Sequence, residues 1–152
     1  MIIEEITPGL EAAEPSGRIL HRILLPHNQM VRRHQRLTTD LGLQLAVDLP
    51  PQEHLYHNRM IYMDSQIAIR VEAAVETTLT IWPQTAREWA LSAYAVGNMH
   101  KPVYLREREI LVPYEAGLVR ILEEQHIKCA VQERQIIGER AGSAAGGHHA
   151  HV

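Results

Sequence analysis

The residues of this sequence that could bind a metal ion are one histidine in the second half of the chain and a group of three histidines near its C-terminus. His100 follows the end of a predicted helix, and Pro102 lies two residues later. His148, His149 and His151 lie in a C-terminal tract of glycine and alanine without apolar neighbours that could bury them. Imidazole nitrogens are ligands for borderline divalent cations. We therefore predict that His100 supplies one ligand from folded backbone and that the tail supplies mobile ones.

The other histidines and the single cysteine have less distinctive surroundings. Cys129 alternates with Ile127 and Val131, which predicts a buried thiol rather than a nucleophile. The chain has ten histidines in 152 residues, and six of them share no spacing. We expect these six to be surface or hydrogen-bonded residues: His21, His27, His34, His54, His57 and His126.

Composition excludes several classes of function. Fifteen Lys and Arg against eighteen Asp and Glu give a formal charge of −3, so there is no bulk electrostatic attraction to nucleic acid or an anionic membrane. One cysteine allows neither an intrachain disulfide nor a Cys-x-x-Cys site. The N-terminus lacks the pattern of a secretion signal, and we expect a cytoplasmic protein. No Gly-x-Ser-x-Gly, phosphate-binding glycine loop or His-Glu-x-x-His motif occurs, which argues against the common hydrolases and nucleotide-binding enzymes.

The first half of the chain reads as a small all-β domain, residues 1–77. Alternating or β-branched segments bounded by proline and turn residues predict strands at 18–25, 42–49, 60–63 and 67–72. The basic stretch at 32–36 is more typical of a solvated strand face or loop than of a binding patch.

Strand and helix patterns alternate in residues 78–140. Thr85 and Glu88 have the spacing of a capping box and begin a helix that ends near Gly97, which we predict as the left-handed residue of the helix terminus. The order β-α-β-β-α-β predicts a ferredoxin-like domain, giving an α+β protein overall. The strands are expected at 79–82, 103–105, 110–112 and 127–133, and the second helix at 114–125. Residues 141–152 read as a flexible, histidine-bearing tail.

A single imidazole cannot hold a metal ion alone, so a metal site at His100 also predicts that two copies of the chain associate. A two-fold dimer with contacts near His100 would bring two imidazoles together by symmetry. The segment from Arg140 to His149 has a root-mean-square reach of about 15–18 Å, which is enough to close over a nearby site. The irregular order His-His-Ala-His-Val favours a native tract over an expression tag.

Several segments resemble the urease accessory protein UreE family, the nickel metallochaperones of urease maturation. The similarity extends over most of the chain from about residue 40, and Gly-Asn-x-His is its most specific motif. The segments that carry it are Ile67–Arg70, Ile81–Thr85, Ala93–His100, Glu109–Tyr114 and the histidine-bearing C-terminus.

This resemblance implies a homodimer that binds one Ni²⁺ between two His100 side chains. Histidines of the tail, above all His149 and His151, would complete the site, and Zn²⁺ or Cu²⁺ would fit the same ligands. The implied partners are the urease apoprotein complex and the urease accessory GTPase. The family also has an N-terminal β domain similar to a co-chaperone peptide-binding domain and a C-terminal ferredoxin-like domain.

The sequence departs from the family in two places near the expected site. Met99 replaces the usual arginine, which removes a cation beside the metal. The stretch 114–117 lacks the histidine pair of some relatives, which argues against a second internal site. Two further functions stay open: a protein-binding module whose β domain holds a client peptide, with incidental metal binding by the tail, and a metal-dependent hydrolase. The second is disfavoured because no carboxylate base lies within the His100 motif.

Overall fold

The computed structural model describes residues 1–141, and the tail histidines His148, His149 and His151 lie outside this part of the chain. The fold is mixed α+β. Its contacts divide it into two compact units, of which the first is Met1–Ala74 and the second begins at Val75. No helix within the described residues is long and apolar enough to cross a bilayer.

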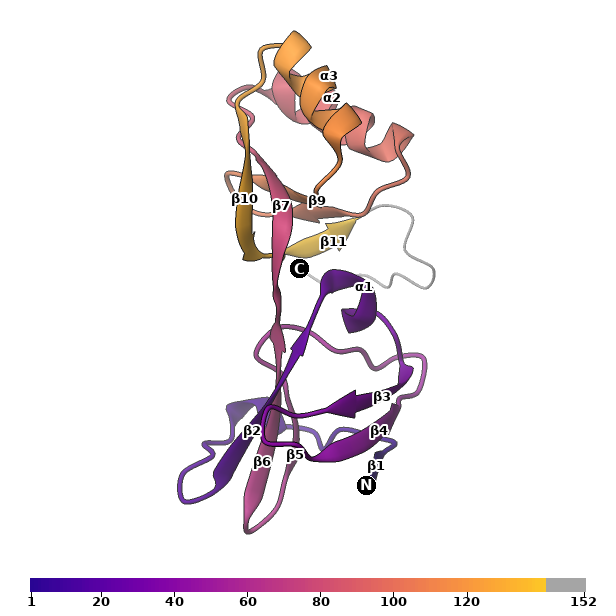
Figure 1. Cartoon of the computed structure of the whole chain (residues 1–152), viewed down its shortest axis with the longest axis vertical. Coiled ribbons are helices and arrows are strands. Elements are labelled where there is room, and N and C mark those ends of the chain that lie inside the picture. Colours follow the sequence, from indigo (N-terminus) through magenta and orange to yellow (C-terminus); the bar gives the residue numbers. More distant parts are fainter. Residues whose placement is uncertain (142–152) are drawn as a thin grey trace. The chain divides into compact units, whose positions relative to one another are not determined.

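The first unit consists of two three-stranded sheets with the strand orders β1-β4-β3 and β2-β6-β5 (Figure 1). The pairs β1-β4 and β2-β6 are parallel, and β3-β4 and β5-β6 are antiparallel. The strands are β1 (Ile2–Ile3), β2 (Ile19–Leu25), β3 (His34–Thr38), β4 (Gln44–Asp48), β5 (Met60–Met63) and β6 (Ile67–Ala73). The unit also contains a short 3₁₀ turn, η1 (Leu10–Ala12), and a one-turn helix, α1 (His27–Met30).

The core of the first unit comes from alternate positions on these strands. Ile23 and Leu25 of β2, Leu45 and Val47 of β4, and Val71 of β6 are buried together in one cluster. Their intervening neighbours mostly face outward, as expected for strands with one buried face.

The second unit is a five-stranded sheet with two helices on one face (Figure 1). Its strand order is β10-β7-β9-β8-β11, and every neighbouring pair is antiparallel. The elements are β7 (Val75–Ile81), α2 (Ala86–Asn98), β8 (Val103–Leu105), β9 (Ile110–Pro113), α3 (Ala116–Glu124), β10 (Cys129–Gln135) and β11 (Glu139–Ala141).

The apolar core of this unit lies between the sheet and the helices. Leu79 and Ile81 of β7 pack with Val96 of α2 and with Leu118 and Leu122 of α3, and all five are almost fully buried. Burial of one apolar stripe per helix is the main stabilising contribution of such a layer.

The last strand takes an unexpected path to the far edge of the sheet. Residues 136–138 leave β10, Ile136 packs against Tyr104 and Leu111 in a separate buried cluster, and β11 then pairs with β8. Ala141 was expected to begin the tail, but it is the last residue of β11 and pairs with Val103. The backbone pairing with β8 makes Ala141 part of the sheet.

Candidate functional site

Helix α2, which leads to His100, begins with a well-formed cap. The Thr85 side-chain oxygen accepts a hydrogen bond from the Glu88 backbone N–H at 3.1 Å. The Glu88 carboxylate accepts one from the Gln84 backbone N–H at 3.3 Å. These bonds satisfy donors that a helix start leaves free, so the first turn of α2 is anchored.

The end of α2 differs from the sequence-based prediction. Gly97 lies inside the helix, and the left-handed residue is His100, with φ 55°. The His100 N–H donates to the Gly97 carbonyl at 3.0 Å, and the Lys101 N–H donates to the Val96 carbonyl at 3.4 Å. This pair of bonds is a Schellman motif with histidine at the position usually held by glycine. The helix extends past Gly97 because these two bonds satisfy the carbonyls of its last turn.

The conformation of His100 directs its ring to the surface. The side chain is exposed, and neither ring nitrogen hydrogen-bonds to another residue within 1–141. Both nitrogens are therefore available to a ligand. His, Asn and Asp occupy the left-handed region more often than other non-glycine residues, which makes this backbone position compatible with an accessible imidazole.

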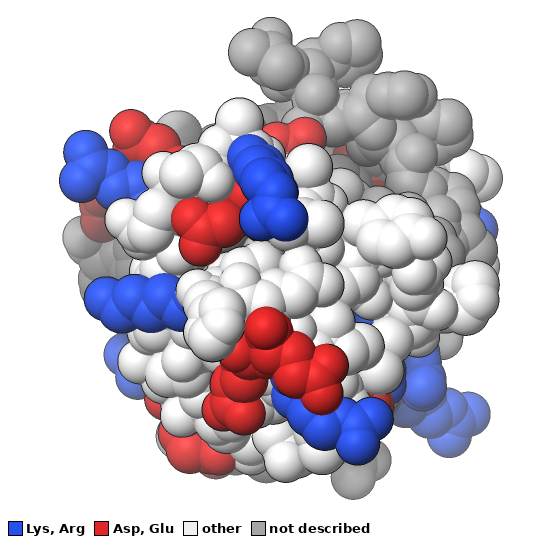
Figure 2. Space-filling model, turned by 90° about the horizontal axis from the view of Figure 1, so that it is seen from above, with Lys and Arg blue, Asp and Glu red and all other residues white. Residues whose placement is uncertain are grey.

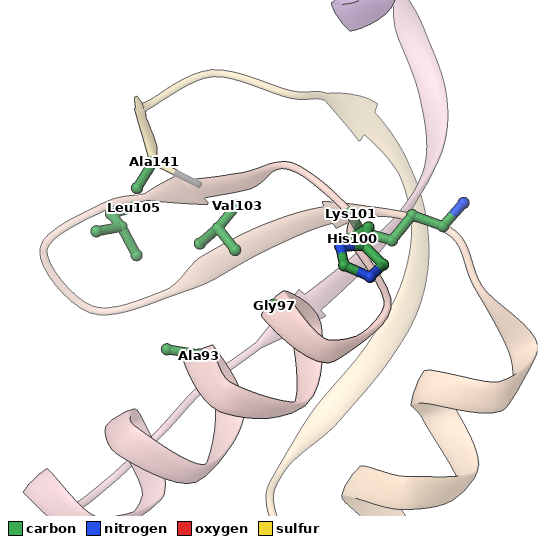
Figure 3. A pocket seen from close by; sticks show the side chains of 7 residues that line it. All are labelled: Ala93, Gly97, His100, Lys101, Val103, Leu105 and Ala141. Atoms are coloured by element: carbon green, nitrogen blue, oxygen red, sulfur yellow. The ribbon is translucent and has the colours of Figure 1, made fainter. Parts of the chain in front are cut away.

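His100 lies at one end of an open hollow of about 210 Å³ (Figure 3). Helix α2 forms one wall, β8 forms another, and the end of β11 closes the far side. The Lys101 side chain extends away from the apolar part of the hollow (Figure 3). The lining residues are Ala93, Gly97, His100, Lys101, Val103, Leu105 and Ala141.

The residues on either side of His100 fasten its loop to helix α3. The Met99 side chain is half-buried against the core, and its Cε lies 3.0 Å from the position a Cβ on Gly117 would take. The Lys101 Nζ lies 3.4 Å from a Glu115 carboxylate oxygen. Met99 therefore acts as a packing residue here. These two contacts hold the backbone of His100 while leaving its ring free.

The described residues do not assemble a complete metal site. Within residues 1–141, no group of three or more His, Cys, Asp or Glu side chains is close enough to hold one ion. His100 can therefore supply a single nitrogen ligand. The residues His148, His149 and His151, predicted as its partners, lie outside the described part of the chain.

Among the other histidines, the ring centroid of His54 lies 5.6 Å from that of Tyr56, and four more have identified contacts or conformations. His21 Nδ1 lies 2.9 Å from the Thr39 hydroxyl oxygen, and His34 is paired with Asp48. The remaining two also involve the backbone: His57 Nδ1 accepts a hydrogen bond from the Ala73 N–H at 3.0 Å, and His126 has φ 59°.

His126 repeats the backbone arrangement of His100 at the end of α3. Its N–H donates to the Glu123 carbonyl, and the Ile127 N–H donates to the Leu122 carbonyl, both at 3.0 Å. Its side chain is exposed as well. Each of the two histidines follows an amphipathic helix, which is a signal for a left-handed terminal residue. Because glycine is the commonest residue at such ends, the sequence-based prediction assigned that position to Gly97. His126 is thus a matched control for His100.

Cys129 and the most elaborate ion pair of the second unit belong to the scaffold. Cys129 is half-buried against the core, and burial together with the Glu123 charge raises the pKa of its thiol. Arg134 donates to both oxygens of Glu109, at 2.8 and 3.1 Å, and these bonds hold the pKa of that carboxyl below its ordinary value. The raised pKa keeps the thiol protonated, and the ion pair ties up the Glu109 carboxylate, so neither acts as a nucleophile.

On the face that Figure 2 shows, charge is mixed rather than gathered by sign. Figure 2 shows a face on which Lys and Arg side chains alternate with Asp and Glu around uncharged surface. The face thus offers no continuous basic patch of the kind that binds a phosphate backbone. A separate feature of α2 is that its Tyr94 is 69% exposed.

Comparisons with known proteins agree on one family. Residues 3–74 match the family described as "UreE urease accessory protein, N-terminal domain". A urease accessory protein UreE of Staphylococcus saprophyticus is 30% identical over 138 residues, covering 90% of this chain and 92% of the relative. The protein of the same name from Geobacillus kaustophilus is 28% identical over 136 residues, with 90% and 92% covered. That of Haemophilus influenzae is 28% identical over 152 residues, with 97% and 82% covered.

Proposed function

This chain belongs to the UreE family of urease accessory proteins, and from that membership we propose that it is a nickel metallochaperone. It binds Ni²⁺ at a homodimer interface through His100 and delivers the ion to apo-urease during urease maturation. The urease apoprotein complex and the urease accessory GTPase are its proposed partners. Its role is to hold and transfer an ion rather than to catalyse a reaction.

The single observation that carries the proposal is the placement of His100 and Ala141 around the same hollow. His149 follows Ala141 by eight residues, so a flexible connection would have a root-mean-square reach of about 14–17 Å. The segment carrying His148, His149 and His151 would thus start from the hollow that His100 also lines. Without β11, the same tail would start at β10, on the opposite edge of the sheet.

A dimer is proposed because His100 alone is an insufficient ligand set. A two-fold axis beside the exposed end of α2 would pair two His100 rings, with tail nitrogens filling the remaining positions. The exposed Tyr94 ring, one turn before the end of α2, would add apolar area to such an interface.

The finer fold assignment also belongs to this proposal. The order β10-β7-β9-β8 with α2 and α3 on one face supports a ferredoxin-like domain extended by β11. We further propose a cytoplasmic location, where the Cys129 thiol would stay reduced.

Metal identity follows from ligand chemistry only in part. Imidazole suits Ni²⁺, Zn²⁺ and Cu²⁺, and the usual affinity order favours copper. Nickel selection would therefore depend on supply and on the delivery partners. Because ligation needs neutral imidazole, whose reference pKa is about 6.5, affinity should fall as the pH drops below that value. Equal nickel affinity at pH 5 and pH 8 would contradict imidazole ligation.

Calorimetric titration of nickel into four forms of the protein tests the proposal. The intact chain should bind one ion per dimer, with the stoichiometry checked by sedimentation. His100→Ala should abolish that site, and a chain ending at Gly147 should bind more weakly. His126→Ala, the matched control, should bind like the intact protein. Unchanged stoichiometry and affinity in His100→Ala would overturn the interface site, and an effect of the truncation alone would assign binding to the tail.

A further inference from the structure

Lys101 places a positive charge directly beside the proposed metal ligand. It follows His100 in the chain, and among the described residues that line their common hollow it is the one with a permanent charge. An ammonium group repels a divalent cation, and a dimer that pairs two His100 rings would bring two lysines to the same ion. The charge at this place therefore bears directly on how tightly the site holds a dication.

Glu115 supplies a negative charge to the same loop from the start of α3. It occupies the N-cap position of this helix, yet its side chain accepts no capping hydrogen bond, and glutamate is not among the residues preferred for capping. Its carboxylate instead lies 3.4 Å from the Lys101 Nζ and makes no other ion pair or hydrogen bond with residues 1–141. Within this part of the chain, the carboxylate therefore serves Lys101.

Folding stability does not account for this ion pair. Both side chains are 36% exposed, and ion pairs with this exposure usually contribute little to the free energy of unfolding. The loop also has a second fastening, because the Met99 side chain packs against the core without any charge. The effect of the pair should therefore appear in the local charge rather than in the fold.

The charged residues of β11 belong to other parts of the surface around the hollow. Glu139 lies opposite Leu105 in the sheet, and Leu105 is at the end of the hollow away from His100 (Figure 3). The Arg140 guanidinium lies over the Tyr104 ring, 5.9 Å from its centroid. Among the described residues, the ion pair is therefore the charged feature at the His100 end.

We propose that Glu115 is the counter-charge of the metal site, and that by neutralising Lys101 it allows a divalent cation to bind tightly at His100. The inference rests on the proposed nickel site and adds a residue that sets its affinity. A unit charge about 10 Å from a dication changes the binding constant roughly fourfold in water without salt, and two copies per dimer multiply the effect. Salt screens such charges over about 10 Å at 0.1 M, so the effect depends on ionic strength.

Calorimetric titration of Ni²⁺ into the full chain, at about 10 mM and about 500 mM NaCl, tests the counter-charge. The variants are Lys101→Met, Glu115→Gln and the two combined. Both partners are changed because the dipole of α3 would favour an acid at this position as well. The control is Glu124→Gln, which removes the same charge at the other end of α3, where Glu124 lies 4.0 Å from Arg120.

In the low-salt buffer, Glu115→Gln should weaken nickel binding about threefold to tenfold, and Lys101→Met should strengthen it by a similar factor. The combined variant should return to within about twofold of the parent, and Glu124→Gln should stay within the same range. Both single effects should shrink in the high-salt buffer. If Glu115→Gln disturbs the start of α3, Lys101→Met remains decisive, since the absence of any gain in affinity overturns the proposal.

Three other results also overturn it. Weaker binding in both single variants would mean that the pair only fastens the loop. Weak binding that persists in the combined variant would make Glu115 a direct ligand, and equal effects in the two buffers would exclude a charge effect. If His100→Ala abolishes the site while the other variants bind like the parent, the counter-charge alone fails; if His100→Ala binds like the parent, the proposed nickel site fails and the counter-charge with it.

Discussion

Replacing His100 or His126 by glycine separates the cost of a left-handed backbone from the function of an imidazole. Both residues have φ between 55° and 59° and close a Schellman motif with the same two backbone bonds. Both side chains are exposed, so neither substitution removes packing. Any difference between the two variants must therefore come from what the rings bind.

The expected magnitude follows from two opposing terms. A non-glycine residue in the left-handed region costs roughly 1–2 kcal/mol. Glycine removes that cost but gives the unfolded chain more freedom, worth about 0.5–1 kcal/mol. Each variant should thus be more stable than the parent by about 0.5–1 kcal/mol in the absence of metal. With a urea m-value of about 2 kcal/mol/M, the midpoint should rise by roughly 0.3–0.5 M.

Urea unfolding followed by tryptophan fluorescence measures this effect, since Trp82 and Trp89 both lie in the second unit. In metal-free buffer, His100→Gly and His126→Gly should shift the transition alike. With nickel added, the parent and His126→Gly should gain further stability, whereas His100→Gly should gain little. Destabilisation by His100→Gly without metal would refute the reasoning, because it would give the His100 ring a structural contact that the fold does not explain.

Three further perturbations have defined outcomes. Gly138→Ala would place a Cβ 2.7 Å from the Leu105 carbonyl oxygen at φ 154°, so the second unit should lose about 1–3 kcal/mol, seen as a lower thermal midpoint. Nickel affinity should fall as well, because the proposed tail ligands follow β11 in the chain and its pairing with β8 would be disturbed; unchanged values for both would contradict this reasoning. Glu109→Gln should make the free energy of unfolding depend less on pH in the acid range. Arg134 lowers the folded pKa of the Glu109 carboxyl below its ordinary 4.5, so the stabilisation from this carboxylate is present above that value and is lost as the pH falls through the folded pKa. Parallel stability–pH curves for parent and variant would refute this. Met99→Ala removes a half-buried side chain from the core and should cost about 1–2 kcal/mol while nickel stoichiometry stays the same; loss of stoichiometry in a folded variant would mean that Met99 does more than pack.

Local sequence pattern accounts for most of the regular structure. Alternating apolar residues identified β4 and β6, and β-branched residues before a proline identified β2 and the end of β7. The Thr85 cap located the start of α2. Sequence pattern did not identify β1, η1, α1 or β11, which span two to four residues. They form because neighbouring strands or turns supply their backbone partners, and that information is not local. The basic stretch at 32–36 is typical of a strand face or loop, and its last three residues begin β3 (His34–Thr38) because β4 supplies their backbone partners.

The sequence by itself indicated the family, which the comparisons confirm, and His100 as a candidate metal ligand. It could not assign the left-handed position to His100 rather than Gly97, because that choice depends on the last helical carbonyls finding donors at Lys101 and His100. It also could not place Ala141 and His100 around the same hollow, since that arrangement depends on the pairing of β11 with β8. Residue chemistry is a local property of the chain, whereas the direction in which a ring points and the place where a tail begins depend on long-range backbone pairing.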